Sequence, residues 1–254
     1  MTVEVTLSAQ VRGTLSVYPV TTLHEFGLDA FVTDRFGGVS EAPYDSLNLA
    51  LHVGDDASNV RENRARVARA AGVAPERLAI VSQVHGRDVL DVSGAPDGAE
   101  ADGLVTSSSD LALAMLVADC IPVALVDAAS RRFAAVHAGW RGLDGGVLER
   151  AVEQFEHPTL LHAFLGPAIS FEGYQVGPDV ASRFAHVPAA LRADGGDRSR
   201  LDLRLVAAHQ LRALGVADGN ISMCTQVTDG GETFYSDRAQ RPTGRFALVA
   251  RAAS

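Results

Sequence analysis

The sequence LALAMLVADCIPVALV, residues 111–126, constrains the fold more than any other stretch of the chain. Its apolar runs 111–117 and 122–127 have the length and composition of buried strands. Neither run approaches the about 18 to 20 apolar residues that a helix needs to cross a bilayer. The interruption at Asp119 and Cys120 therefore puts an acid and a thiol between two buried strands, where they are candidates for a functional site.

The remaining periodicity predicts a mixed architecture. Residues 55–72 read as a helix capped by Ser58 and ended by Gly72, and segment 111–138 reads as adjacent strands joined by the turn AASRR. Strands do not alternate regularly with helices, which favours a single α/β domain of the α+β type over residues 1–254, with mixed sheets flanked by helices. Further helices are expected at 143–155 and at 203–215, closed by Gly215, and further strands at 78–86, 88–93, 133–138, 160–166 and 245–251.

Composition limits the partners and the compartment. The formal net charge of -9 argues against a nucleic-acid partner, because phosphates require a basic surface. A small anion remains possible where a few arginines converge. The N-terminal segment lacks the basic and apolar regions of a signal peptide, so we expect no membrane association. With only 2 cysteines, a disulfide framework is not expected and the reducing cytoplasm is the predicted location.

Two histidines share the context of Cys120 at the end of an apolar strand beside glycine. They are His85 in SQVHG and His137 in AAVHAGWRGL. Two imidazoles and a thiolate suit Zn²⁺, and three protein ligands leave a fourth position open for water or substrate, as in catalytic sites. Taken singly, each residue also fits a buried apolar cysteine or a structural histidine. The ligands are far apart in sequence and no CxxC or HxxxH motif supports them, so spacing alone leaves both interpretations open.

Four other residues are candidates around this trio. Arg141 lies at the expected start of the 143–155 helix, where an anion is favoured, and Arg35 precedes a Gly-Gly turn. Asn48 lies in YDSLNLALHVGD, and Asp119 is suited to orienting a metal ligand or to acid–base chemistry. Each also fits a structural role, as a surface arginine, a turn residue or a cap. Five histidines have ordinary sequence contexts, and we assign them no function: His24, His157, His162, His186 and His209.

A series of short motifs runs from about residue 30 to residue 248. In chain order they are RFGGVS, YDSLNLALHVGD, SQVHG, ADCIPV, AAVHAGWRGL, GPAIS with YQVG, and TGRFA. Together they resemble the bacterial laccase-domain (multicopper polyphenol oxidase-like) family, whose members are regarded as purine nucleoside phosphorylases. HAGWRG combined with ADC is the most specific part of this resemblance.

The resemblance implies a metal site and an activity. The implied zinc ligands are His85, Cys120 and His137, which are the residues that the strand-end argument isolates. The implied reaction is phosphorolysis of adenosine, inosine and methylthioadenosine to the free base and a ribose 1-phosphate, with adenosine deamination as a second activity. The implied partners are a purine nucleoside and phosphate, and the implied fold is a single complex α/β domain, often monomeric. For this reaction we expect the metal to bind phosphate, and Arg141, with Arg35, to complete the phosphate pocket beside it.

One segment departs from the family pattern. Where relatives commonly read Phe-Phe-Ser-Tyr-Arg-Arg, this chain has TFYSDRAQRPTGR, residues 233–245. Arg238 keeps the first arginine, whereas Ala239 replaces the second and Asp237 replaces the aromatic residue. If this segment lines the substrate cleft, we expect a changed substrate preference with the metal trio untouched.

Alternative functions follow from the same residues. Two histidines and a cysteine also describe a copper site, but a multicopper oxidase needs a trinuclear cluster, and this chain has 8 histidines and no His-x-His motif. A hydrolase with Cys120 as nucleophile and His137 or His85 as base would need no metal. A cytidine-type zinc deaminase is disfavoured because H-x-E and P-C-x-x-C are absent. A metal-bound accessory protein without catalytic activity remains a further alternative.

Overall fold

The two apolar runs form strands of different sheets in the computed structural model, which describes residues 1–96 and 98–253. β8 (Ala112–Val117) lies in a six-stranded sheet, and β9 (Ile121–Asp127) lies in a seven-stranded sheet. The prediction of adjacent strands over 111–138 is correct for β9 and β10 (Phe133–Ala138), which pair antiparallel, and wrong for β8. β8 pairs with β16 and β5 instead. Residues 118–120 are therefore the crossover between the two sheets.

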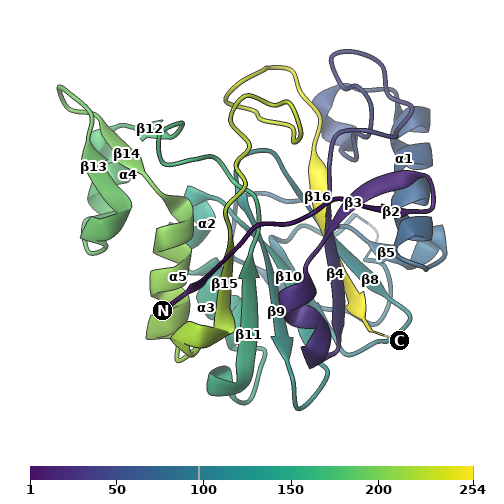
Figure 1. Cartoon of the computed structure of the whole chain (residues 1–254), viewed down its shortest axis with the longest axis horizontal. Helices are drawn as coiled ribbons and strands as arrows, with labels where there is room; N and C mark the ends of the chain where they lie inside the picture. The colour runs from purple at the N-terminus through teal and green to yellow at the C-terminus, as the bar shows by residue number, and fades with distance from the viewer. Residues whose placement is uncertain (97, 254) are drawn as a thin grey trace.

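The sheets are mixed, which confirms the α/β fold class with mixed sheets flanked by helices (Figure 1). The seven-stranded sheet has the order β1 (Val3–Val5), β15 (Ile221–Cys224), β11 (Leu161–Leu165), β9, β10, β7 (Gly103–Thr106) and β6 (Val89–Asp91). The six-stranded sheet has the order β2 (Gln10–Arg12), β3 (Leu15–Pro19), β4 (Leu28–Thr33), β16 (Phe246–Ala252), β8 and β5 (Leu78–Ala79). A small three-stranded sheet has the order β12 (Gln175–Val176), β14 (Ser199–Leu201) and β13 (Leu191–Ala193).

The two large sheets pack face to face, with helices on their outer faces. Alternate residues of β9 point to opposite sides: Ala124 packs with Met115 of β8 between the sheets, whereas Leu125 packs with Leu148 under the helices. Figure 1 shows α2, α3 and α5 on one side of the molecule and α1 on the other. Because both faces of β8 and β9 are covered, both faces must be apolar, which explains the unbroken apolar runs.

Helix ends differ from the sequence-based prediction at two places. α1 spans Ala57–Ala70, and its cap is Asp56, whose side chain accepts a hydrogen bond from the backbone N–H of Ser58, so the prediction of a Ser58 cap is wrong. The helix predicted at 143–155 is two short helices, α2 (Trp140–Gly145) and α3 (Val147–Val152). Gly146 separates them with a φ of 85°, a left-handed conformation that ends a helix.

Other boundaries follow the prediction more closely. α5 (Leu203–Ala213) is followed by Gly215 with a φ of 98°, and the strands predicted at 88–93, 133–138, 160–166 and 245–251 are present as β6, β10, β11 and β16. The strand predicted over 78–86 is wrong beyond Ala79, because residues 80–86 leave the sheet to form a loop. α4 (Pro178–Ala181) and several short strands near the N-terminus have no counterpart in the prediction.

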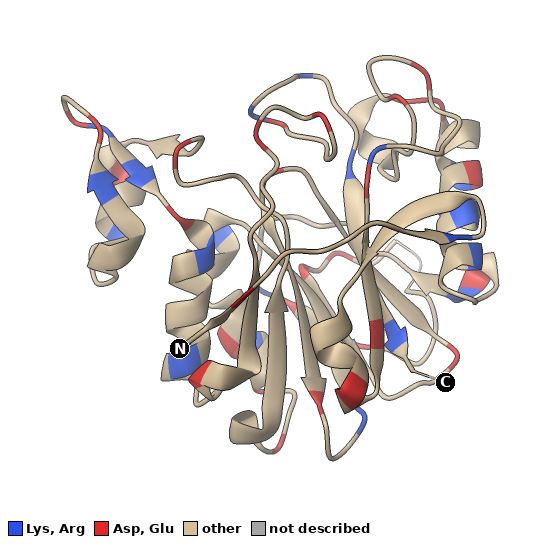
Figure 2. Ribbon diagram, in the orientation of Figure 1, with Lys and Arg blue, Asp and Glu red and all other residues tan. Residues whose placement is uncertain are grey.

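Charged residues lie mainly on loops and helices, while the central strands carry few of them (Figure 2). Within the described residues, no helix combines the length and apolar character needed to cross a membrane.

The break at Gly146 can be tested by substitution. Alanine in a left-handed conformation costs about 1–2 kcal/mol, so Gly146→Ala should lower the free energy of unfolding by that amount in urea denaturation. In a continuous helix the same change would raise it by about 1 kcal/mol. Gly145→Ala is the matched control, because its added Cβ would lie 3.9 Å from Arg87 Cβ, an ordinary contact. A stabilised Gly146→Ala variant would contradict the observed break.

Candidate metal centre and pocket

The sheet crossover presents Cys120 at the edge of the sandwich. Asp119, just before it, has a φ of 88°, and Cys120 is half-buried. The Asp119 carboxylate accepts hydrogen bonds from Thr228 Oγ1 at 2.6 Å, Ser236 Oγ at 2.7 Å and the backbone N–H of Arg238 at 2.7 Å. These bonds fix the crossover to the loop that precedes β16, so Asp119 joins two walls of the site.

His137 enters the site from the end of β10. The side chain is buried, and its Nδ1 lies 2.7 Å from Asp102 Oδ1. Gly139 follows two residues later and gives the site its space: a Cβ there would lie 2.9 Å from Cys120 Sγ and 3.0 Å from His85 Nδ1. Any larger residue at Gly139 would therefore displace the thiol and the second imidazole.

His85 lies on the loop that replaces the end of the predicted strand. Its φ of 58° is left-handed, and the loop is held by the fully buried Asp102 carboxylate. This carboxylate accepts hydrogen bonds from the backbone N–H groups of Val84 at 3.3 Å, His85 at 3.0 Å and Gly86 at 2.6 Å. The Gln83 side chain also pairs with both backbone groups of Leu116 in β8. The loop is thus tied to both sheets.

The structure brings His85, Cys120 and His137 together, with one potential ligand atom from each within 4.8 Å of the others. Among residues 1–96 and 98–253, they are the one set of three His, Cys, Asp or Glu side chains close enough to share a metal ion. Two imidazoles and a thiol are a donor set that suits Zn²⁺. Asp102 occupies Nδ1 of His137 and leaves Nε2 for a metal, the carboxylate–histidine arrangement common around metal ligands. The donors therefore fit a metal.

Electrostatics favour the ligating form of the thiol. Burial disfavours the thiolate, but His137 and then His85 outweigh it, and the pKa of Cys120 is lowered. Burial disfavours the charged imidazole of His137 as well, but Cys120 and Asp102 outweigh it and raise the pKa of His137. The hydrogen bond from His137 likewise overcomes burial to lower the pKa of Asp102. A charged thiolate is the form that binds a metal.

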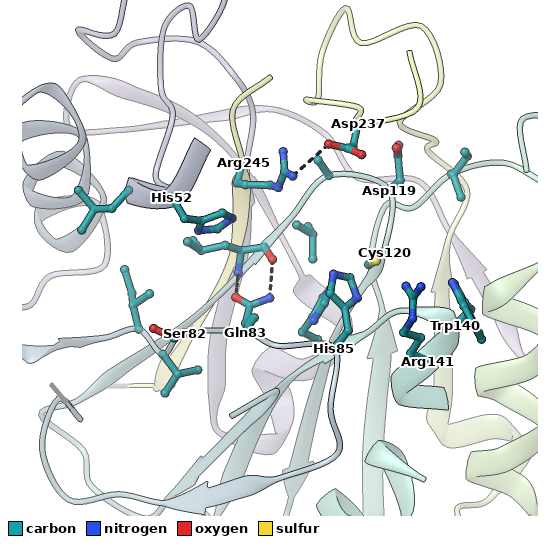
Figure 3. Close-up of a pocket in the computed structure, with 18 of the residues that line it drawn as sticks. His52, Ser82, Gln83, His85, Asp119, Cys120, Trp140, Arg141, Asp237 and Arg245 are labelled. Carbon is teal, nitrogen blue, oxygen red and sulfur yellow. Dashed lines mark hydrogen bonds and ion pairs between the residues drawn. The ribbon is translucent and has the colours of Figure 1, made fainter. Parts of the chain in front are cut away.

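The trio opens onto a cavity of about 560 Å³, within the size range of small-molecule sites. Figure 3 shows Arg141 and Trp140 near Cys120, with His52, Arg245 and Asp237 on other walls of this pocket. Sequence reasoning missed most of these walls. The pocket-lining residues it missed include His52, Arg64, Gln83, Trp140, Tyr174, Arg241 and Arg245.

Two of the four surrounding candidates line the pocket. Asp119 and Arg141 do so, and Arg141 lies in the first turn of α2, as predicted for a helix start. However, α2 has only 6 residues, so the expected contribution of a long helix dipole does not apply. The Arg141 guanidinium lies 4.4 Å from the ring centre of Trp140.

Arg35 and Asn48 are outside the pocket lining. Arg35 donates to the carbonyls of Asp45 at 3.0 Å and Gly231 at 2.6 Å, which holds two loops together. Asn48 is fully buried, and its Oδ1 accepts a hydrogen bond from the backbone N–H of Arg245 at 2.9 Å. Asn48 therefore supports a pocket residue through the main chain.

The two positions where the sequence departs from the family pattern, Asp237 and Ala239, differ in their relation to the pocket. Asp237 lines the pocket, and Ala239 is not among its lining residues. Asp237 is therefore the departure that can contact a ligand bound in this pocket.

Metal affinity should depend on Asp102. Asp102→Asn removes a carboxylate that orients His137 and accepts three N–H groups, so we expect the affinity for Zn²⁺ to fall about 10- to 100-fold. Competition with a chromophoric chelator measures this. Asp127→Asn is the control: Asp127 is also buried, and its carboxylate accepts from Ala129 N and Ser130 Oγ in the β9–β10 turn. Unchanged affinity in a folded Asp102→Asn variant would refute the role of Asp102.

The chain is similar to known proteins along most of its length. A family model described as multi-copper polyphenol oxidoreductase laccase matches residues 29–252. "Purine nucleoside phosphorylase YfiH" of Shigella flexneri is 41% identical over 228 residues, covering 87% of this chain and 92% of that protein. "Purine nucleoside phosphorylase Rv2149c" of Mycobacterium tuberculosis is 41% identical over 224 residues, covering 85% of this chain and 89% of that protein.

Solved structures agree with the fold. YlmD from Geobacillus stearothermophilus superposes with a TM-score of 0.90 at 30% identity, covering 98% of this chain and 100% of that one. Protein NMB0706 of Neisseria meningitidis gives a TM-score of 0.84 at 36% identity, covering 90% of this chain and 95% of that one. The extent of these matches shows that this chain belongs to the multi-copper polyphenol oxidoreductase laccase family.

Proposed function

We propose that this chain is a zinc-dependent purine nucleoside phosphorylase that acts on adenosine, inosine and methylthioadenosine, with adenosine deamination as a second activity. The products are the free base and ribose 1-phosphate or its methylthio derivative. The observation that carries the proposal is that the His-Cys-His trio opens onto one cavity together with several arginines. Relatives named purine nucleoside phosphorylase support the same reaction.

His85, Cys120 and His137 would hold the zinc ion. Structural zinc sites are closed by four protein ligands, whereas catalytic sites use three and keep a position open. When bound, zinc would act as a Lewis acid toward phosphate in phosphorolysis and toward water in deamination. Gly139 keeps the space between the ligands free, and Asp102 holds His137 in the required orientation.

Phosphate would be held by two arginines close to the trio. The Arg238 guanidinium lies 5.1 Å from the ring centre of Tyr174, and both Arg238 and Arg141 oppose the rise in the Tyr174 pKa. Burial, followed by the nearby Cys120, raises that pKa to about 12, so the phenol stays protonated and can donate a hydrogen bond. One guanidinium group can donate two parallel hydrogen bonds to two oxygens of a phosphate. Arg141 and Arg238 would thereby orient phosphate for attack on C1′ of the ribose.

Asp119 serves this site as a positioning residue. Both of its carboxylate oxygens already accept hydrogen bonds, from two hydroxyl groups and the backbone N–H of Arg238. Through that last bond it sets the position of an arginine that we assign to phosphate. Proton donation to the departing purine is therefore assigned to another group or to solvent.

One observation favours a second candidate function, a metal-independent cysteine hydrolase. Cys120, His137 and Asp102 have the order of a nucleophile, its base and a carboxylate that orients the base. The position of His85 beside the same thiol favours a metal ligand set, because a hydrolase needs only one base. Treatment with a chelator separates the two: phosphorolysis should disappear and return with added Zn²⁺, whereas a cysteine hydrolase would keep its activity.

The reaction itself is tested by chromatography of adenosine incubated with purified, metal-quantified protein, with and without phosphate. Phosphorolysis predicts adenine only when phosphate is present, because phosphate is the nucleophile. Deamination predicts inosine under both conditions. If protein with stoichiometric zinc yields neither product, adenosine is not its substrate.

The metal ligands are tested by His85→Ala. Loss of one ligand should lower zinc content and reduce both reactions by at least about 100-fold, since the charge stabilisation of the metal is lost. His24→Ala, which replaces an exposed histidine outside the pocket lining, should keep zinc content and activity. Full activity in a purified His85→Ala variant would overturn the proposed mechanism.

A further inference from the structure

The arginines of the pocket differ in their charge partners. Asp237 forms ion pairs with both Arg241 and Arg245. Within residues 1–96 and 98–253, neither Arg141 nor Arg238 forms an ion pair with a carboxylate. No carboxylate among these residues therefore neutralises Arg141 or Arg238, although Arg238 Nη1 donates to the carbonyls of Gly173 at 3.5 Å and Gln175 at 3.3 Å. The charges of Arg241 and Arg245 are paired with Asp237.

The Asp237 carboxylate uses one oxygen for each of these two ion pairs. Oδ2 accepts from Arg241 Nε at 2.7 Å and also pairs with Arg241 Nη2. Oδ1 accepts from Arg245 Nη2 at 3.1 Å, and Arg245 Nη1 donates to the carbonyls of Thr243 at 3.2 Å and Gly244 at 3.0 Å. Asp237 therefore pairs with the charges of both guanidinium groups and occupies Arg245 Nη2, while Arg245 Nη1 is held by two carbonyls of its own loop.

Arg245 and its partner Asp237 lie on a different side of the pocket from Arg141 (Figure 3). Figure 3 shows Arg245 and Asp237 with His52 near Arg245, while Arg141 and Trp140 lie at another wall beside Cys120. Burial, together with Arg245, Arg64 and His85, lowers the pKa of His52, so this imidazole is neutral at pH 7. Leu51 and Ile80 add apolar surface to the lining. Arg64 also lines the pocket, and its Nε donates to the carbonyl of Leu49 at 2.8 Å. His52, Leu51 and Ile80 offer neutral hydrogen-bonding and apolar surface, which suits a nucleobase and sugar.

We infer that Asp237 makes the pocket selective for neutral nucleosides and excludes nucleoside 5′-phosphates. This inference rests on the proposed function, because it takes a nucleoside as the substrate. Asp237 acts in two ways: it occupies two guanidinium groups that would otherwise bind a second phosphate group, and its own charge opposes an anion. Specificity then comes from a repulsive element as well as from attraction. The inorganic phosphate is left with Arg141 and Arg238, next to the metal ligands.

The experiment is isothermal titration calorimetry of the purified full chain with adenosine and, separately, with adenosine 5′-monophosphate. In Asp237→Asn, we expect the monophosphate to bind at least about 10-fold more tightly than in the wild type, as for a gained charge interaction. Adenosine affinity should stay within about 2-fold, because adenosine carries no charge. Asp237→Glu keeps the charge and should behave as the wild type, and Asp237→Ala should repeat the gain if the asparagine variant folds poorly.

Asp29→Asn is the matched control. Asp29 also binds a guanidinium through both oxygens, with Arg12 at 2.9 and 2.8 Å, and its side chain is 25% exposed against 27% for Asp237. It lies outside the pocket lining, so monophosphate affinity should not change.

The possible outcomes separate this inference from the proposed function. If adenosine binds and monophosphate affinity is unchanged in folded Asp237→Asn and Asp237→Ala, the role of Asp237 is refuted while the nucleoside site stands. If monophosphate affinity rises but adenosine binds neither protein, Asp237 still excludes anions and the proposed nucleoside substrate is refuted. An equal rise in Asp29→Asn would assign the effect to net charge and refute the local role of Asp237.

Discussion

The arrangement of the His-Cys-His trio depends on the buried carboxylate of Asp102. It accepts the N–H groups of residues 84–86 and binds Nδ1 of His137, so it joins the loop after β5 to the end of β10. A buried charge is costly unless its hydrogen bonds are satisfied, and here four donors surround it. The same bonds hold His85 in its left-handed conformation. A single side chain therefore sets the positions of two of the three residues of the trio, one on the loop after β5 and one at the end of β10.

The crossover from β8 to β9 explains both what the sequence predicted and where it failed. The apolar runs predicted two buried strands, because strands covered on both faces need apolar residues on both faces. The same reasoning could not assign the strands to different sheets, since pairing depends on distant partners such as β16. The loop at 80–86 was predicted as a strand because its residues resemble one. In the structure, Asp102 accepts its backbone N–H groups, and its Gln83 side chain binds the backbone of Leu116 in β8.

The grouping of His85, Cys120 and His137 was predictable because each follows an apolar run, and the two histidines also have glycine within two residues. Asp102 was not, because its partners lie 16 to 35 residues away and nothing in its neighbourhood indicates them. Arg35 was singled out before a Gly-Gly turn and Asn48 within YDSLNLALHVGD, yet they hold loops together. Local sequence identifies such residues as constrained, but only three-dimensional contacts distinguish supporting residues from pocket-lining ones. The single-domain organisation stays a prediction.

The pocket also shows why net charge describes this protein poorly. A chain with a formal charge of -9 gathers five arginines around one cavity, from α1, α2 and the loop before β16. The local electrostatic field depends on which charges are paired. Asp237 neutralises Arg241 and Arg245, whereas Arg141 and Arg238 near Tyr174 have no carboxylate partner among the described residues. His137 lies on β10, Cys120 on the crossover and His85 on the loop that Asp102 fixes, whereas Asp237 lies on the loop before β16. The Asp237 carboxylate pairs with Arg241 and Arg245, and the bonds from Thr228, Ser236 and Arg238 to Asp119 hold the crossover beside Cys120. Substitution of Asp237 can therefore change the charge of the pocket while the Asp119 bonds remain.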